Sequence, residues 1–379
     1  MEIHGTCDPR FERVREAFAE NFEKRGEVGA AVAVTIDGRT VVDLWGGFMD
    51  AERTRPWDRD TIVNTYSTTK GMATIVAHRL VEQGLIDLEA PVARYWPEFA
   101  QAGKEEIPVH FLLSHRAGLA ALDRPVPPED LYAWDPMIHA IEAQEPNWEP
   151  GTKHGYHAIT FGFLVGEVVR RVTGRTLGQV FRDEVAGPLG ASFYIGFGPE
   201  LDDRVATMIP APPLPPEMQA AFRNAGPGSL SVRVFSNPSG FDVNSRGWRA
   251  AEIPAANGHG TARALARIYG ALACGGEAGG VRVLSQESIA RATTEQASGP
   301  DAVILMHTRY GLGFWLSSET IPLGKGLAAF GHPGAGGSVG FADPDARLGF
   351  GYVMNQMATG LTVAGTGATL TAAVYECLE

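Results

Sequence analysis

This sequence has few lysines, and its acidic residues outnumber its basic residues. Only five of its 32 basic residues are lysines, at positions 24, 70, 104, 153 and 325, and the formal net charge is -12. A nucleic-acid-binding protein needs a basic patch, and so does a protein held at an anionic membrane surface. The charge balance therefore argues against both kinds of partner.

Cysteines are few, and long apolar runs are missing. Cys7, Cys274 and Cys377 are odd in number and far apart, which fits neither a disulfide framework nor a metal-binding pattern. No run approaches the roughly 18 apolar residues of a membrane span, and the first residues lack the basic start and apolar stretch of a signal peptide. We expect a soluble, cytoplasmic protein without metal or cofactor. The pattern makes no prediction of oligomeric state.

Strand-like and helical segments follow a simple order along the 379 residues. Asp8-Pro9 is typical of a helix start, and apolar residues at helical spacing then predict a helix over residues 8–25. Two β-rich runs around Asp37-Gly38 predict a hairpin. The middle third is predicted to be mostly helical and the last third to contain mostly strands. Residues 361–377 are predicted to form a final helix.

This order predicts how the chain is divided. Early and late strands can share one sheet only if the middle of the chain is an insertion. We therefore expect an α/β lobe built from residues 1–79 and 195–379, and a helical lobe of residues 80–194. Active sites favour the cleft between two such lobes.

One of the scarce lysines stands three residues after a serine, in "YSTTKGMATIVAHRL". Apolar residues at helical spacing follow, so Ser67 and Lys70 share one face at the start of a helix. A serine hydroxyl is a poor nucleophile until a base removes its proton, and a lysine can be that base when burial or positive charge lowers its pKa. N–H groups at a helix start stabilise negative charge, so the Ser67 N–H is a candidate oxyanion donor.

The spacing of this pair is suggestive but not specific. With 14 serines and five lysines, chance alone gives roughly 0.2 such pairs in 379 positions. An N-cap serine followed by a solvated lysine would show the same spacing. Other residues must decide between the two interpretations.

A second serine motif offers an alternative candidate nucleophile. "GGSVG", with Ser338 at its centre, fits the G-x-S-x-G pattern of α/β-hydrolase nucleophiles, which lie between a strand and a helix. Here "FADPDARLGF" follows, which predicts a strand and a turn. That mechanism also needs a histidine later in the chain, whereas the last one is His332. We therefore expect Ser338 to be a small residue in a tight strand.

Two further loops supply candidate residues. Tyr156 follows a Pro-Gly turn, and a tyrosine beside a cation can carry protons because the cation lowers its pKa. In "FGHPGAGGSVG", glycine lets the backbone approach a ligand, so the Ala335 N–H is a second candidate oxyanion donor. His332, Gly334 and His157 are candidate substrate contacts, although packing would explain each of them singly.

Together these elements resemble the serine β-lactamase and penicillin-binding protein superfamily. They occur in the order Ser67-Thr68-Thr69-Lys70, "LLSHRAGL" (112–119), "WEPG" followed by Tyr156, and His332-Pro333-Gly334. The similarity covers most of the chain and is nearest to the class C β-lactamase-like esterases, the family VIII carboxylesterases. It implies an α+β, β-lactamase-like fold, with an antiparallel sheet flanked by N- and C-terminal helices and an inserted, mostly helical lobe.

The resemblance also implies roles for the candidate residues. Ser67 would be the nucleophile that forms an acyl-enzyme, and Lys70 its proton partner. Tyr156 would be a general base or a proton carrier to the leaving group. The N–H groups of Ser67 and Ala335 would form the oxyanion hole. Which of Lys70 and Tyr156 is the base in each step stays open.

Two motifs depart from the β-lactamase pattern. The asparagine of the Tyr-x-Asn motif is Ala158, and the Lys-Thr-Gly motif is His332-Pro333-Gly334. A β-lactam would lose polar contacts at about 1–3 kcal/mol each, whereas a neutral ester would not miss them. We therefore expect a carboxylesterase acting on short-chain esters, with β-lactam hydrolysis weak. A β-lactamase or D-amino-acid peptidase is the alternative enzyme, and a catalytically silent binding protein is the alternative of another class.

Overall fold

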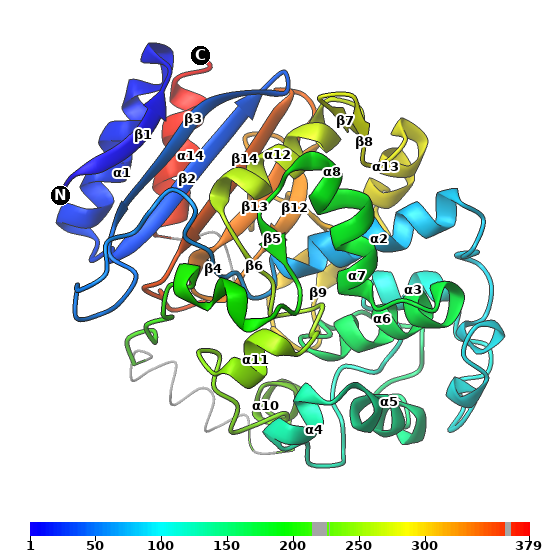
Figure 1. The fold of residues 1–379 in the computed structure, drawn as a ribbon. Helices are drawn as coiled ribbons and strands as arrows, with labels where there is room; N and C mark the ends of the chain where they lie inside the picture. Colours follow the sequence, from blue (N-terminus) through cyan, green and yellow to red (C-terminus); the bar gives the residue numbers. More distant parts are fainter. Residues whose placement is uncertain (214–225, 227, 361–364) are drawn as a thin grey trace.

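The computed structural model describes residues 1–213, 226, 228–360 and 365–379. Among these, nine strands form one antiparallel sheet, in which the N-terminal hairpin pairs with the last strand of the chain (Figure 1). The order across the sheet is β1 (Ile3–Cys7), β3 (Arg39–Gly47), β2 (Gly29–Ile36), β14 (Leu348–Met354), β13 (Val339–Asp343), β12 (Phe330–Pro333), β11 (Trp315–Leu316), β10 (His307–Tyr310) and β9 (Ala297–Pro300).

Helices from both ends of the chain flank this sheet. α1 (Glu12–Lys24) and α14 (Thr366–Glu376) lie side by side on one face, and α12 (Ala262–Ala273) crosses the other (Figure 1). The expected N-cap before α1 is present, because the Asp8 carboxylate accepts the Arg10 N–H at 2.9 Å. Of the predicted closing helix, residues 361–364 lie outside the described residues.

α12 approaches the sheet closely because small residues meet at the contact. A Cβ on Gly349 of β14 would lie 2.2 Å from the backbone nitrogen of Gly270. Thr35 of β2 donates its hydroxyl to the Ala266 carbonyl at 3.1 Å. This contact holds α12 closely against the sheet.

α2 (Thr69–Glu82) runs through the middle of the molecule. Its predicted apolar stripe of Met72, Ile75, Val76 and Leu80 is fully buried. The helix contacts β12 of the sheet and also α6 (Thr160–Thr173) and α7 (Leu177–Phe181). Side chains that project from the start of α2 therefore lie close to the sheet and to these two helices.

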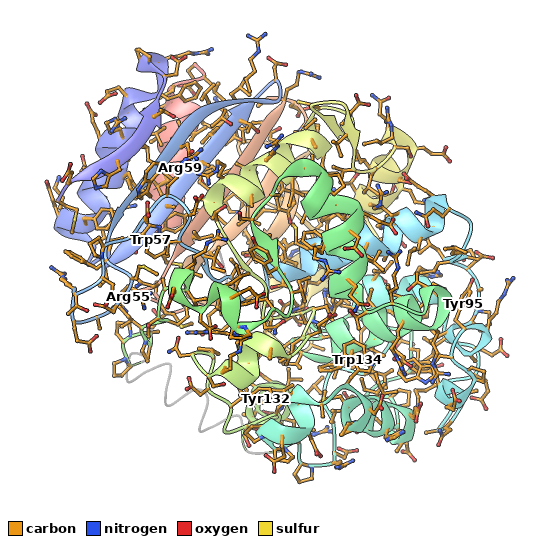
Figure 2. All side chains as sticks on the ribbon, viewed as in Figure 1. Arg55, Trp57, Arg59, Tyr95, Tyr132 and Trp134 are labelled. Atoms are coloured by element: carbon orange, nitrogen blue, oxygen red, sulfur yellow. The ribbon has the colours of Figure 1, made fainter. Side chains whose placement is uncertain are left out.

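The segment from residue 83 to residue 192, all of it described, contains helices and turns but no strand. Its other α-helices are α3 (Val109–Leu113), α4 (Pro128–Tyr132), α5 (Trp134–Ala143) and α8 (Gly187–Leu189). Trp134, labelled in Figure 2, packs over Gly166 and donates its indole N–H to Glu167 at 2.8 Å. One hydrophobic core includes side chains from these helices and from the sheet.

The remaining described elements are short or peripheral: α10 (Leu230–Ser236), α11 (Arg246–Ala250), α13 (Gln286–Thr293), β4 (Val63–Asn64), β5 (Phe193–Tyr194), β6 (His259–Gly260), β7 (Glu277–Ala278) and β8 (Val281–Arg282). β4, β6 and β5 form a small sheet, and β4 leads directly toward α2. None of the helices in the described residues is both long enough and apolar enough to cross a membrane.

Candidate active site

Ser67 lies in the turn between β4 and α2. The N–H groups of residues 68 to 70 each donate to the carbonyl three residues earlier, so the turn winds tightly into the helix. Tyr66 has a φ of +46°, a left-handed conformation that is unfavourable for a residue with a side chain. The chain therefore reverses sharply just before Ser67. The serine stays partly exposed while Thr68 and Lys70 are buried.

Lys70 is fully buried beside this serine. Its Nζ lies 3.2 Å from Ser67 Oγ, 2.8 Å from the Ala158 carbonyl oxygen and 2.9 Å from the Ala255 carbonyl oxygen. Burial lowers the pKa of Lys70 well below its usual value. A neutral amine has two N–H donors and one lone pair. In the neutral form the two carbonyls take the N–H groups, and the lone pair is left to accept the Ser67 proton.

Tyr156 covers the same amine from the loop before α6. Its ring centroid lies 4.7 Å from Lys70 Nζ, and the phenol is buried. Burial raises the pKa of Tyr156, the hydrogen bond with Ser67 lowers it, and the charge of Asp301 raises it further, for a net increase. This result differs from the expected lowering by a nearby cation. The physical reason is that desolvation of the buried phenol is the largest effect and outweighs the hydrogen bond with Ser67.

Gly334 brings the loop after β12 against the turn that carries Ser67. A Cβ at this position would lie 2.2 Å from both the Thr65 carbonyl oxygen and Ser338 Oγ, so only glycine fits. Among the described residues, neither the Ser67 N–H nor the Ala335 N–H has a hydrogen-bond acceptor within the protein. The two predicted oxyanion donors are thus on turns in contact with each other, and both are available.

Ser338, the centre of the second serine motif, connects these turns. It is buried, donates its hydroxyl to the Thr65 carbonyl at 2.8 Å, and lies 3.3 Å from Thr68 Oγ1. β13 follows it directly, as the sequence predicts, and not a helix. Its contacts are those of a structural residue.

His332 lies beside Tyr156, with 6.0 Å between the two ring centroids. Its Nδ1 donates to the Pro333 carbonyl at 2.7 Å, whereas Nε2 has no partner among the described residues. Burial lowers the pKa of His332 to about 3, so the ring is neutral near pH 7. It therefore presents a lone pair and no charge on this side of the site.

His157 has no ring nitrogen left for a ligand. Its Nε2 accepts the Leu119 N–H at 3.0 Å, and its Nδ1 donates to the Gly155 carbonyl at 2.7 Å. The ring is fully buried. This arrangement differs from the predicted substrate contact, because both polar atoms hold the two loops together.

Several groups around these residues are not apparent from the sequence. The Ala158 and Ala255 carbonyls that bind Lys70 leave no side-chain signal. Asp301, whose carboxylate accepts the Tyr156 N–H at 3.0 Å, stands in no recognisable motif. The ring centroid of His115 lies 5.1 Å from that of Tyr156. His115 belongs to the "LLSHRAGL" stretch, so this motif is the sequence feature that could have indicated it.

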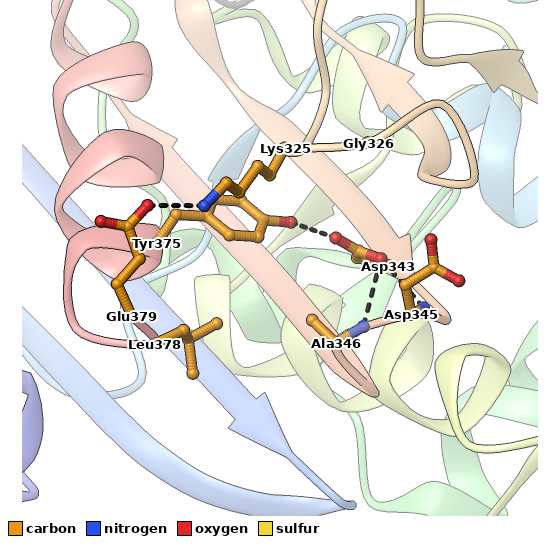
Figure 3. Close-up of a pocket in the computed structure, with 8 residues that line it drawn as sticks. All are labelled: Lys325, Gly326, Asp343, Asp345, Ala346, Tyr375, Leu378 and Glu379. Atoms are coloured by element: carbon orange, nitrogen blue, oxygen red, sulfur yellow. Dashed lines mark hydrogen bonds and ion pairs between the residues drawn. The ribbon is translucent and has the colours of Figure 1, made fainter.

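A separate pocket opens beside α14 (Figure 3). It is lined by Lys325, Gly326, Asp343, Asp345, Ala346, Tyr375, Leu378 and Glu379. Lys325 pairs with Glu379, and Tyr375 donates to Asp343. The pocket therefore contains no nucleophile next to a base. Among the described residues, no cluster of histidine, cysteine and acidic side chains could hold a metal ion.

Comparisons with known proteins show which family the chain resembles. A family model described as Beta-lactamase matches residues 14–373. "Esterase/beta-lactamase LipL" of Mycobacterium tuberculosis (strain ATCC 25618 / H37Rv) is 38% identical over 373 residues, which cover 95% of this chain and 85% of that protein.

Solved structures are similar over the full length. The crystal structure of a family VIII carboxylesterase is 48% identical, with a TM-score of 0.91 and 100% coverage of both chains. A penicillin-binding protein homolog from Caulobacter crescentus is 39% identical, with a TM-score of 0.90 and the same coverage. These matches confirm the predicted resemblance and the α+β, β-lactamase-like fold. This chain belongs to the beta-lactamase family.

Proposed function

We propose that this protein is a serine carboxylesterase that hydrolyses short-chain, uncharged esters through an acyl-enzyme on Ser67. The observation that carries the proposal is the 3.2 Å contact between Ser67 Oγ and the buried amine of Lys70. The relatives support the reaction class, since one is named an esterase/beta-lactamase and another is a family VIII carboxylesterase.

Acylation begins at the Ser67 hydroxyl. Lys70 takes its proton as Oγ bonds to the carbonyl carbon of the ester, and the N–H groups of Ser67 and Ala335 stabilise the oxyanion. The bond from carbon to the alcohol oxygen then breaks. Tyr156, whose raised pKa keeps it protonated, gives its proton to the departing oxygen, and the Lys70 ammonium restores it. Alcohol leaves, and the acyl group stays on Ser67.

Deacylation uses the same groups in reverse. Water takes the place of the alcohol, and the Tyr156–Lys70 pair removes one of its protons as the water oxygen attacks the acyl carbon. When the bond to Ser67 Oγ breaks, that proton returns to the serine, and the carboxylic acid is released. The proposed steps require no cofactor or metal in either half of the reaction.

The surroundings of Ser67 favour a neutral substrate. His332 is uncharged. Ala158 has no side-chain amide, and its backbone carbonyl already binds Lys70. Neither residue supplies a charge for the carboxylate of a β-lactam. The name of the M. tuberculosis relative makes slow β-lactam hydrolysis the second activity to measure.

We further propose that the ester enters between the part formed by residues 1–79 and 195–379 and the helical part formed by residues 80–194. Ser67 and Lys70 belong to the first part and Tyr156 to the second, so a substrate that reaches all three touches both. We also propose that the protein acts in the cytoplasm, since its three cysteines are free thiols, as in a reducing compartment.

Labelling with a serine-reactive phosphonate tests the proposal. Mass spectrometry should find the adduct on Ser67, and Ser67→Ala should abolish hydrolysis of p-nitrophenyl butyrate. Ser338→Ala is the matched control and should keep most of the activity, because that hydroxyl binds only protein groups. An adduct on Ser338 would assign the reaction to the other motif, and the absence of any adduct would favour a binding protein. A large preference for nitrocefin over the butyrate ester would instead identify a β-lactamase.

A further inference from the structure

Asp301 is a buried carboxylate that the mechanism above does not use. It follows β9 and is 1% exposed. Its Oδ1 accepts the N–H groups of Val303 at 2.8 Å and Ile304 at 3.0 Å, which close its own turn. The same oxygen accepts the Tyr156 N–H at 3.0 Å, and Tyr310 donates its hydroxyl to Oδ2 at 3.3 Å. One bond of this carboxylate therefore reaches the candidate active site.

Further contacts join the same two segments. The Ala302 N–H donates to the His154 carbonyl at 3.1 Å. Val303 packs over Gly155, where a Cβ would lie 3.1 Å from Val303 Cγ2. The turn of Asp301 thus holds the backbone of residues 154–156 on both sides of the tyrosine. Since Tyr156 lies on a loop, its position relative to Ser67 depends on such contacts.

The carboxylate also acts through its charge. A negative charge near a phenol disfavours the phenolate, and Asp301 adds to the raised pKa of Tyr156 in this way. Burial lowers the pKa of the nearby amine and of each nearby imidazole, which disfavours the positively charged forms that would oppose this effect. These groups are Lys70 from α2, His115 from the loop after α3, His154 and His157 from the Tyr156 loop, and His332 from β12. Tyr310 from β10, which also faces Tyr156, stays protonated because burial raises its pKa.

We propose that Asp301 is a positioning residue of the esterase, which holds Tyr156 against Ser67 and keeps its proton available for the departing alcohol. The inference rests on the proposed function. It extends that function to a residue that touches neither the substrate nor the reacting atoms.

Two esters with different leaving groups test this role. p-Nitrophenolate departs without a proton, whereas an alkoxide needs one from a general acid. Asp301→Asn keeps the size of the side chain and one acceptor oxygen for the backbone N–H groups, but it removes the charge. We expect kcat/KM for ethyl butyrate to fall at least about tenfold, and kcat/KM for p-nitrophenyl butyrate to fall by less than about threefold.

Asp343 provides a matched control (Figure 3). Its Oδ1 accepts the Asp345 and Ala346 N–H groups, and its Oδ2 accepts the Tyr375 hydroxyl, so its bonding resembles that of Asp301. It ends β13 at the opposite end from Ser338. Asp343→Asn should leave the ratio of the two kcat/KM values unchanged. If Asp301→Asn lowers both values equally, or neither, the proposal is overturned.

A second variant covers the case in which Asp301→Asn does not fold. Tyr310→Phe removes the hydrogen-bond donor to Asp301 Oδ2. It should also lower kcat/KM selectively for ethyl butyrate, but by a smaller factor. An equal effect on the two esters would also overturn the proposal.

Phosphonate labelling distinguishes failure of the Asp301 proposal from failure of the proposed esterase function. A labelled, active Asp301→Asn enzyme with an unchanged ratio rejects only the role of Asp301, whereas unlabelled wild-type Ser67 rejects the esterase.

Discussion

Lys70 and Lys104 are both fully buried, but their surroundings differ. Lys104 Nζ donates to the carbonyls of Glu142 at 2.9 Å and Gln144 at 2.7 Å, and has no hydroxyl beside it. Burial lowers the pKa of both amines, yet nearby glutamates partly offset the effect at Lys104. At Lys70 no such charge contributes. Burial next to a hydroxyl and away from carboxylates is what suits Lys70 to be a base.

The role of Lys70 as a base can be tested with a side chain that donates hydrogen bonds but stays protonated. Lys70→Arg should lower kcat/KM for p-nitrophenyl butyrate by about 10²–10⁴-fold, because a guanidinium donates hydrogen bonds but cannot accept the Ser67 proton. Lys104→Met is the control, and it should lower the thermal midpoint while leaving kcat/KM close to that of the wild type. Near-normal activity in Lys70→Arg would rule out the amine as the base.

At the scale of elements, the contact between α12 and β14 depends on glycine. Gly349→Ala would place a methyl group 2.2 Å from the Gly270 nitrogen and 2.3 Å from the Ala266 carbonyl oxygen. Backbone atoms cannot give way as side chains do, so the helix must move away from the sheet.

We expect Gly349→Ala to lower the free energy of unfolding by about 1–3 kcal/mol or more, measured by urea denaturation. Gly228→Ala is the control, since a Cβ there meets nothing within 4 Å, and it should change stability by less than about 0.5 kcal/mol. Equal stability of the two variants would show that the α12 contact is more adaptable than its geometry indicates.

At the scale of the whole molecule, one buried acid links its two ends. Glu27 precedes β2 and accepts a hydrogen bond from the hydroxyl of Tyr352 on β14, whose oxygen also lies 2.8 Å from Thr366 Oγ1 at the start of α14. Burial raises the pKa of Glu27 to about 8. The folded protein therefore holds this proton at pH values where the unfolded chain, with a carboxyl pKa near 4.3, has released it.

This difference makes stability depend on pH. Between about pH 4.5 and pH 8 the folded state binds more protons, so the Glu27 contribution is complete at low pH and is lost as pH rises through this window. Glu27→Gln cannot ionise and should flatten the curve, with a gain over wild type that grows toward pH 8. Thermal midpoints at a series of pH values check this expectation. Parallel curves for the two proteins would contradict it.

Much of the fold and part of the site could be predicted from local pattern. The helical spacing around Met72 and Leu80, the turn at Asp37-Gly38 and the strand after Ser338 all appear in the structure. The resemblance to the β-lactamase family is confirmed by the matches over the whole chain. The catalytic roles of Ser67, Lys70 and Tyr156 stay predictions, and so does the division into two lobes.

The sequence by itself determined what depends on near neighbours: a serine and a lysine three residues apart at the start of a helix, and the turns that precede them. Only the tertiary structure decided that both ring nitrogens of His157 are occupied, that the pKa of Tyr156 is raised, and that a carboxylate 145 residues away binds its backbone. The reason is that desolvation and long-range hydrogen bonds depend on the complete set of surrounding groups, and those groups come from distant parts of the chain.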